Sequence, residues 1–589
     1  MHPARLLLLT VAGAFLGLVG GVAAWGLLHL IGLITNRALY GRWAWDLPPT
    51  TMLERSPMIV IAAVAGALIV ALMAHAAPII RGHGIPEAME SILLRQSRIA
   101  PRAALLKPLS AAIAIGTGGP FGAEGPIIVT GGASGSLLGQ VMPVSPSERK
   151  ILLAAGAAAG MSATFGAPLA SIVLAFELLL FEFSSRSLVP VATASAVAGA
   201  MHYRLIDVGP LFEAPTHELA GLTALPSYAV LGLLCGGLAV VVARGLFLVE
   251  GGFRRLPVSE FWHPAIGALG FALVGLLVPR VLGVGYDVIE DMLSGHLALS
   301  TVLAIFAAKL VAWWLALGSG TSGGTLAPVL IVGSAFGAAL ALMVGQWTPF
   351  EVSATGFALV AMAATFGAST GASLTAIVFM FELTQDYRIV LPLILATVLA
   401  DLVASTLLRD TLMTEKLTRR GVRVVRDYRA DTFARTHVDR VMTSPAESLP
   451  ADASIADAQR ILARGHHSAY PLVDSEGRCR GVISRTDLLA QEQPDSDARP
   501  LLDIASRDVV SVQPQQSVSR AMEVMLEESV EHLPVLDRQG YLLGMFTRTD
   551  VLRARAVEAE EERPQEAVML RRMMRAARVR HAGTRHPRS

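Results

Sequence analysis

One acidic residue, Glu124, stands where an apolar chain rarely carries a charge. It lies in the segment Gly118–Pro126, between an apolar run that ends near Ile115 and another that begins at Ile127. A carboxylate at bilayer depth is costly unless it faces a cavity or a partner. The surrounding glycines and prolines break a helix, which lipid tolerates only where the freed backbone lines a cavity walled by protein. The segment therefore predicts an anion pathway with a carboxylate in its throat.

Two further glycine-rich breaks accompany the one at Glu124. They are Gly82–Glu87 in the first half of the apolar region and Gly318–Pro328 in the second. All three open onto helix-like runs, and a helix N-terminus offers unpaired N–H groups and about half a positive charge. Glycine allows the backbone to approach an ion closely. The three breaks together predict an anion site built from backbone amides.

These breaks interrupt a chain that is too apolar for an ordinary soluble protein. Of its 589 residues, 53% are hydrophobic, and the apolar excess lies before about residue 408. We therefore expect a membrane domain followed by a soluble one. Expected spans are Leu6–Ile34, Pro57–Ile80, Val189–Met201, Tyr228–Val249, Ala265–Val278, Thr301–Leu317, Leu326–Val344 and Ile389–Leu407. Other apolar stretches are shorter than the roughly 20 residues of a perpendicular span, which favours tilted and re-entrant helices.

The apolar region contains an internal repeat. The run Ala167–Leu178 recurs as Ala372–Leu383 at a constant offset of 205 positions, with seven of twelve residues identical. The repeat places Glu177 and Glu382 in equivalent positions. Each copy follows a stretch of small residues suited to close helix packing. Duplicated halves predict a two-fold repeat with a binding site between them.

At these motifs the sequence resembles the CLC family of chloride channels and proton-coupled chloride antiporters. The family patterns GSGIP, G(K/R)EGP and GxFxP correspond here to Gly82–Pro86, Gly122–Pro126 and Gly324–Pro328. The resemblance covers roughly residues 1–420. It implies an α-helical polytopic membrane protein of many tilted and broken helices, with inverted halves at about 1–206 and 224–420. It also implies a homodimer in the inner cell membrane, with one pore in each subunit.

The resemblance assigns Glu124 as the gating glutamate. When ionised it occupies an anion site, and when protonated it swings away, which couples anion movement to protons. The resemblance also implies backbone and side-chain contacts to the anion. These candidates are His83, Gly84, Ile85, Thr325, Leu326 and Met413.

Two of these positions depart from the family. His83 replaces an ion-coordinating serine, and its imidazole N–H either donates to the anion or points aside and leaves only the backbone to bind. Met413 aligns with a central tyrosine and offers no hydroxyl. Selectivity among chloride, bromide, nitrate and fluoride therefore stays open.

The proton route departs as well. Leu178 stands where the family's antiporters carry an internal proton-transfer glutamate, which favours passive conduction. Glu177 is adjacent and is the first candidate for a bypassing proton route, although it and Glu382 are alternatively packing or interface groups. Proton-coupled antiport and a voltage- or pH-gated channel both remain open.

The soluble part contains a second repeat. Residues 438–489 and 504–552 each run from a helical pattern into a strand–turn–strand and close as Gly-x-x-Ser/Thr-Arg-Thr-Asp. This resembles a tandem pair of CBS domains, an α/β module. We place the two domains at 437–493 and 501–556, after a linker at 421–436 and before a charged tail at 557–589.

The CBS resemblance implies a regulatory site for an adenine nucleotide (ATP, ADP or AMP). In that module the hydroxyl contacts phosphate and the carboxylate holds ribose hydroxyls, in keeping with their donor and acceptor capacities. The candidates are Ser484, Asp487, Thr547 and Asp550. The alternative is a strut that binds nothing. The Arg/Lys-rich stretch Arg409–Arg429 places this module in the cytoplasm by the positive-inside rule.

Other classes of protein are less well supported. We find no nucleophile–base or metal-ligand arrangement, so we expect neither an enzyme nor a required cofactor. We expect no nucleic-acid partner either, although the net charge of +1 by itself says nothing about one. A CBS-gated divalent-cation channel would need clustered acidic ligands, which scattered glutamates do not supply. A membrane sensor with a vestigial pore is the remaining alternative.

Overall fold

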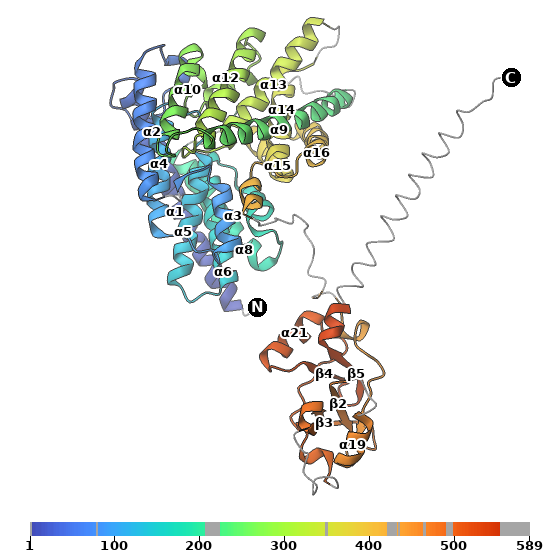
Figure 1. Cartoon of the computed structure of the whole chain (residues 1–589). Helices are drawn as coiled ribbons and strands as arrows, with labels where there is room; N and C mark the ends of the chain where they lie inside the picture. The colour runs from blue at the N-terminus through green and yellow to red at the C-terminus, as the bar shows by residue number, and fades with distance from the viewer. Residues whose placement is uncertain are drawn as a thin grey trace, which may run out of the picture. The chain divides into compact units, whose positions relative to one another are not determined.

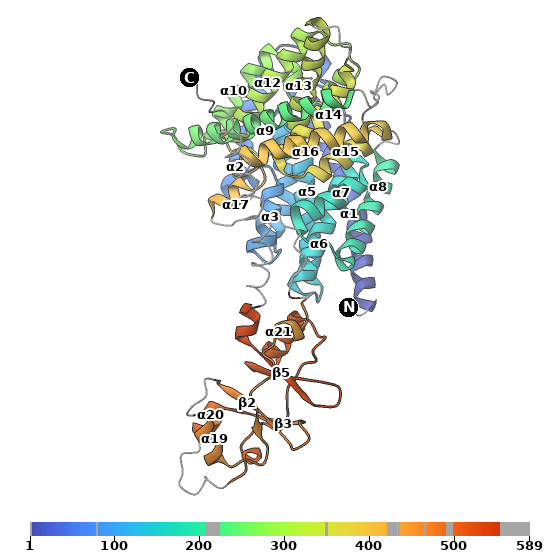
Figure 2. The same ribbon diagram turned by 90° about the vertical axis from the view of Figure 1, so that its right-hand side faces the viewer.

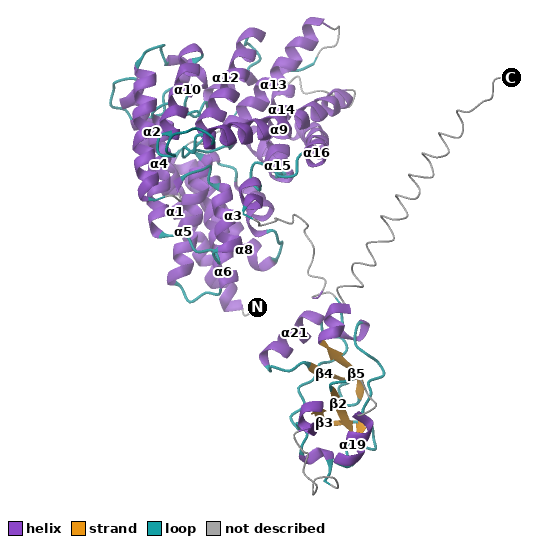
Figure 3. Ribbon diagram, in the orientation of Figure 1, coloured by secondary structure: helices purple, strands orange, loops and turns teal. Residues whose placement is uncertain are grey.

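The computed structural model divides the chain into two compact units, Met1–Asp427 and Tyr428–Ser589. It describes residues 3–77, 80–206, 212, 224–347, 352–420, 433, 436–462, 467–489 and 499–553. Most of the predicted linker at 421–436 and all of the predicted tail at 557–589 lie outside these ranges. Among the described residues, β-strands occur only in the second unit (Figure 3).

The first unit is helical, and its elements fall into two corresponding series. The first series is α1 (Pro3–Leu39), α2 (Met58–Ala76), α3 (Ile85–Leu94), α4 (Pro101–Gly116), α5 (Glu124–Val141), α6 (Pro146–Phe165), α7 (Pro168–Leu174) and α8 (Ser185–Leu205). The second is α9 (Leu225–Arg254), α10 (His263–Leu277), α11 (Tyr286–Leu293), α12 (Leu299–Gly318), α13 (Leu326–Trp347), α14 (Ala354–Thr370), α15 (Ser373–Thr384) and α16 (Val390–Leu407), followed by α17 (Glu415–Arg419). Figure 1 shows them as two neighbouring groups, blue to teal and green to yellow.

Six helices in the described part of the chain are long and apolar enough to cross a membrane. They are α1, α2, α9, α12, α13 and the segment Tyr387–Leu407, which contains α16. The expected spans at Val189–Met201 and Ala265–Val278 form α8 and α10. The sequence analysis did not name α4, α5, α6 and α14 among the expected spans; α14 is apolar but has only 17 residues.

Small residues allow the backbones of the buried helices to approach each other closely. A Cβ atom added to Gly131 of α5 would lie 2.1 Å from the carbonyl oxygen of Gly156 in α6. The equivalent pair in the second half is α13 and α14, where a Cβ on Gly337 would lie 2.2 Å from the carbonyl oxygen of Phe357. The predicted small-residue stretches therefore serve close helix packing, in the manner of small-xxx-small membrane interfaces. Long helices cover this core, and α9 and α16 lie side by side in Figure 2.

The predicted repeat forms a reciprocal contact between the two halves. Glu177, in a π-helical turn (Ala175–Leu180) after α7, accepts hydrogen bonds from the first backbone amides of α15. Glu382 of α15 accepts from the amides of Leu169 and Ala170 at the start of α7, at 2.8 and 2.7 Å. Each half thus caps a helix of the other, because a helix N-terminus leaves its first N–H groups unpaired.

The second unit contains two copies of one small α/β motif. In the first, β1 (Leu449–Pro450) pairs in parallel with β2 (Ala469–Val473), which pairs antiparallel with β3 (Cys479–Ser484). In the second, β4 (His532–Leu536) and β5 (Leu542–Thr547) pair antiparallel in the equivalent register. Both hairpins have a register shift before the last residue of their first strand. The described helices are α19 (Ile455–Leu462), α20 (Arg485–Leu489) and α21 (Val518–Glu527).

Candidate anion pathway and nucleotide site

The three glycine-rich breaks meet inside the first unit. Gly82 forms a bridge with Ser322, and Gly122 forms a bridge with Gly324. A Cβ atom on Gly84, whose φ is 103°, would lie 2.4 Å from the carbonyl oxygen of Gly125. Glycine is required at this approach because any side chain would collide with backbone. The convergence that three Gly-rich breaks predicted is therefore present, and α3, α5 and α13 all begin beside it.

Glu124 is the first residue of α5 and its side chain is fully buried. One carboxylate oxygen, Oε1, accepts a hydrogen bond from the hydroxyl of Tyr286 at 2.6 Å. The carboxylate also faces the backbone amide of Ala327 in the first turn of α13. Glu124 thus faces the N-terminus of α13, which begins at Leu326, one of the candidate anion contacts.

Three buried polar atoms around this point have no hydrogen-bond partner among the described residues. They are Oε2 of Glu124, Nδ1 of His83 and Oγ1 of Thr325. Buried polar groups are nearly always paired, so an unpaired one in a native structure calls for an explanation such as a functional role, a water or an ion. Each of the three glycine-rich breaks contributes one of these unpaired side-chain atoms. Several unpaired polar atoms in one region are the arrangement expected of a small-ion site.

The remaining anion-site candidates differ in what they offer. The N–H of Gly84 already donates to Oε2 of Glu87 at 2.7 Å, so in this structure it is not free for an anion. Ile85 and Leu326 are the first residues of α3 and α13. Met413 is fully buried and supplies packing surface without a hydroxyl.

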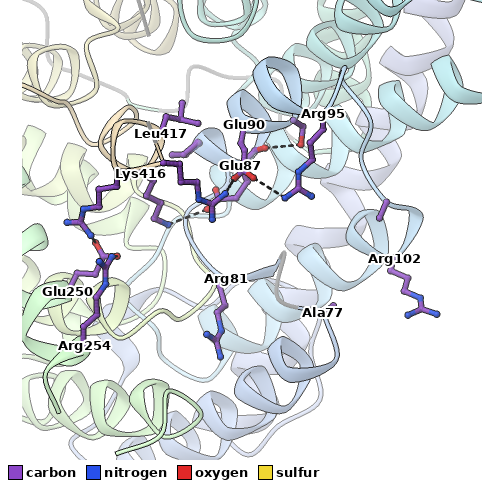
Figure 4. A pocket seen from close by; sticks show the side chains of 15 residues that line it. Ala77, Arg81, Glu87, Glu90, Arg95, Arg102, Glu250, Arg254, Lys416 and Leu417 are labelled. Carbon is purple, nitrogen blue, oxygen red and sulfur yellow. Dashed lines mark hydrogen bonds and ion pairs between the residues drawn. The ribbon is translucent and has the colours of Figure 1, made fainter. Parts of the chain in front are cut away.

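His83 lines a cavity of about 190 Å³ that also includes Leu412 and Lys416. This cavity shares Arg81 and Lys416 with a larger one of about 810 Å³, the basic cavity shown in Figure 4. The basic cavity is lined by the cations Arg81, Arg95, Arg102, Arg254, Lys416, Arg419 and Arg420 and the carboxylates Glu87, Glu90 and Glu250. Its surplus of cations produces a positive field that raises the local concentration of anions.

Tyr286 is a site residue that the sequence analysis missed. It begins α11 and lines a third cavity, of about 220 Å³, together with Tyr40, Thr50 and Glu290. A signal for it does exist, because the two halves match here as well. Gly283-Val-Gly leads into Tyr286, the first residue of α11, in the same way that Gly82-His-Gly leads into Ile85, the first residue of α3.

A buried lysine holds the loop before each of these short helices. Nζ of Lys107 in α4 donates to the carbonyl oxygens of Ile80 and Gly82, both at 2.7 Å. Nζ of Lys309 in α12 donates to those of Val281 at 2.9 Å and Gly283 at 3.2 Å. Each ammonium thus pairs carbonyl groups that would otherwise be buried without a partner. The two lysines are equivalent in the repeat and fix the loops that present His83 and Tyr286.

The structure places Glu177 in a helix cap. Its carboxylate accepts from the amides of Leu374 at 3.2 Å and Thr375 at 2.9 Å, and from the Thr375 hydroxyl at 2.6 Å. The neighbouring Leu178 is buried in the same π-helical turn. Neither Glu177 nor Leu178 lines the cavities that reach His83 and Tyr286.

The structure separates the four nucleotide candidates into two similar turns. Asp487 accepts from the backbone amide of Ser484 at 2.9 Å and its hydroxyl at 2.7 Å, and Asp550 accepts from those of Thr547 at 2.9 and 2.8 Å. Asp550 also pairs with Arg553 at 2.8 Å and is fully buried.

The second turn lines a cavity formed by described residues of both copies. This cavity, of about 600 Å³, contains Thr547, Asp550, His467, His532 and Arg548. Its volume falls within the range of small-molecule sites. Ser484 and Asp487 are not part of its wall.

Broken helices that meet at a buried carboxylate, within an apolar helical unit, define a membrane-embedded transport protein of the CLC type. The model for the voltage gated chloride channel family matches residues 65–405, and the CBS domain model matches residues 438–492 and 501–557. The chain belongs to this chloride channel family and carries a tandem pair of CBS domains.

Named relatives include both channels and exchangers. The chain is 26% identical to chloride channel protein CLC-f of Arabidopsis thaliana over 622 aligned residues, which cover 90% of this chain and 77% of that protein. It is 33% identical over 353 residues to the H+/Cl− exchange transporter ClcA of Yersinia pestis, covering 56% and 71%. The family, but not the transport mode, follows from these similarities.

Solved structures show the same fold. A slow cyanobacterial Cl−/H+ antiporter superposes with a TM-score of 0.61 at 25% identity, over 71% of this chain and 98% of that one. A eukaryotic CLC transporter superposes with a TM-score of 0.58 at 20% identity, over 92% and 98%, and supports the fold alone.

Proposed function

We propose that this protein moves chloride or another small anion across a membrane along a path between the three glycine-rich breaks, with Glu124 as its gate. The observation that carries the proposal is the group of unpaired buried atoms on Glu124, His83 and Thr325. In the closed state the Glu124 carboxylate takes the anion's place at the first turn of α13. Protonation removes its charge and releases it, so that an anion enters.

The basic cavity serves this pathway as its entrance on the His83 side. Fixed guanidinium and ammonium groups attract anions from solution, and the effect weakens as salt screens the field. The smaller cavity, which shares Lys416 with the basic one, continues to His83. An imidazole donor at this point supplies one of the few side-chain contacts available to the anion, since Met413 has none.

Coupled exchange of anions for protons is the first candidate mode, because relatives of this chain include named H+/Cl− exchangers. Passive conduction is the second, and the buried Leu178 favours it because a leucine cannot carry a proton. The gate itself is compatible with both modes.

Reconstituted protein in liposomes separates these modes. An imposed chloride gradient that drives protons uphill establishes exchange, whereas chloride flux without proton movement establishes a channel. Glu124→Gln mimics the protonated gate, so we expect anion flux that no longer varies with pH. Unchanged pH dependence in Glu124→Gln would contradict the assignment of the gate.

We further propose that the CBS pair regulates transport by binding an adenine nucleotide in the cavity that contains Thr547 and Asp550. Its histidines and arginines suit phosphate, and Asp550 is an acceptor for ribose hydroxyls. No hydrolysis and no other cofactor form part of this proposal.

The proposed setting is an inner cell membrane, with the CBS pair in the cytoplasm and two copies of the chain in a homodimer. Apolar side chains are exposed along α16, including Leu391, Ile394, Val398 and Leu402. Their spacing forms one stripe of a helix and gives a face for lipid or for a second copy. Mass measurement of the detergent-solubilised protein distinguishes monomer from dimer.

A further inference from the structure

We propose that Tyr286 is a latch for the gate: its hydroxyl holds Glu124 in the closed position, and the breaking of this one hydrogen bond sets how readily the gate opens. This inference rests on the proposed gating role of Glu124. Tyr286 acts through Glu124 and is therefore a positioning residue.

The contact is short and directed. Oη of Tyr286 lies 2.6 Å from Oε1 of Glu124, within the range of a strong hydrogen bond to a carboxylate. Among the described residues, no other side chain donates to Glu124. The ring of Tyr286 packs edge-on against Phe165, with centroids 6.1 Å apart, and Phe165 packs against Phe379 at 4.8 Å.

The latch is held by the fold on both sides of Tyr286. Before it, Lys309 holds the loop through the carbonyl oxygens of Val281 and Gly283. After it, Asp287 accepts hydrogen bonds from the backbone amide and the hydroxyl of Thr50, at 2.7 and 2.6 Å. Because α11 is fixed by these contacts, Tyr286 is not free to follow a moving carboxylate. Opening of the gate therefore breaks the bond.

The position of Tyr286 also separates two approaches to the gate. Tyr286 lines the cavity that includes Tyr40 and Glu290, whereas His83 lines the cavity that includes Lys416, and the two cavities share no lining residue. Glu124 lines neither cavity, and its bond to Tyr286 ties it to the Tyr286 side. The hydroxyl thus stabilises the state in which an ionised Glu124 blocks the path.

Other charged groups face this region and bear on its pH dependence. Lys309 of α12 acts on Glu124 electrostatically, and Asp287 and Glu290 of α11 line the cavity next to Tyr286. On the opposite approach, His83 has Glu87, Lys107 and Lys416 around it. A test of the latch must therefore remove the hydroxyl and leave every charge in place.

Tyr286→Phe meets this requirement, because it deletes one oxygen and keeps the ring between Phe165 and the gate. Loss of a donor to the ionised carboxylate makes the closed state less stable, so the gate opens at lower proton concentration. We expect the pH of half-maximal anion flux in liposomes to rise by about one unit or more. The matched control is Tyr228→Phe, which alters another buried tyrosine and should leave this pH unchanged.

The same substitution in a Glu124→Ala background completes the experiment. If Tyr286 acts through the gate, Tyr286→Phe has no further effect there, since the acceptor is absent. A wild-type-like pH profile for Tyr286→Phe, or an equal shift in both backgrounds, overturns the latch. If Glu124→Gln itself keeps the pH dependence, the proposed gate fails as well, so the two failures are distinguishable. Thermal unfolding of Tyr286→Phe identifies any general loss of packing.

Discussion

The reciprocal caps at Glu177 and Glu382 allow a test that decides between a structural and a proton-carrying role for Glu177. Both carboxylates accept hydrogen bonds from the first turn of a helix in the other half. The test replaces each glutamate by alanine and by glutamine and measures thermal stability together with proton movement.

The expected magnitude follows from the bonds that are lost. Glu177→Ala removes three acceptor contacts, at 3.2, 2.9 and 2.6 Å, and Glu382→Ala removes two, at 2.8 and 2.7 Å. Replacing a capping side chain by alanine costs about 0.5 to 2 kcal/mol, typically about 1 kcal/mol. Both carboxylates are partly exposed, so water replaces part of what is lost. We expect about 1 to 2 kcal/mol for each substitution, which corresponds to a fall in Tm of about 1 to 2 °C for a unit of this size.

The assay uses the purified full chain. Tryptophan fluorescence in detergent reports the Tm, and chloride-driven proton movement in liposomes reports coupling. If both residues are caps, the two alanine variants lose similar stability. The two glutamine variants keep an acceptor oxygen and lose less, and any proton coupling of the wild type survives in them. The reasoning is refuted if Glu177→Gln abolishes proton movement at an unchanged Tm while Glu382→Gln leaves it intact.

Three further predictions concern the pathway and the CBS pair. We expect His83→Ser to change the permeability ratios among chloride, nitrate and fluoride, since it exchanges the side-chain donor at the site; identical ratios would leave only the backbone in contact with the anion. We expect Asp550→Ala to weaken ATP binding by the full chain in calorimetry at least tenfold more than Asp487→Ala, because only Asp550 lines the cavity; equal effects would place the nucleotide elsewhere. Burial lowers the pKa of His532 below its ordinary value, with Arg548 and His467 acting in the same direction and Glu531 opposing. As the pH falls, the unfolded chain therefore binds a proton at His532 before the folded chain does. This difference lowers the free energy of unfolding below about pH 6.5 and has no effect well above it. Hydrogen exchange in the second unit should show this loss, and His532→Gln should reduce it.

The sequence was sufficient for features that depend on local chemistry. Glycines and prolines that interrupt apolar runs break helices wherever they occur, so the starts of α3, α5 and α13 were predictable. A carboxylate in such a break has few stable surroundings other than a cavity, and this identified Glu124. The strand–turn–strand pattern likewise predicted both hairpins of the CBS pair, because turn residues and alternating apolar residues act over short distances.

Features that join distant segments needed the tertiary structure. The bond between Tyr286 and Glu124 connects residues that are 162 positions apart. The sequence left Glu177 open between a proton route and a packing or interface group, and only the packing of α7 against α15 shows its carboxylate at a helix start. Similarly, Thr547 and Asp550 have the same local turn as Ser484 and Asp487, but only the tertiary structure shows that Thr547 and Asp550 line the cavity of about 600 Å³.

The physical reason for this division is the range of the forces involved. The sequence by itself determined the membrane class, the broken helices and the carboxylate among them, because backbone conformation and the cost of burying a charge depend mainly on nearby residues. The tertiary structure alone decided which partner each polar group found, because a buried donor or acceptor must be paired by whatever the fold brings within about 3 Å. In this protein, helices from opposite halves supply those partners, and their positions are set by the packing of small residues across the repeat.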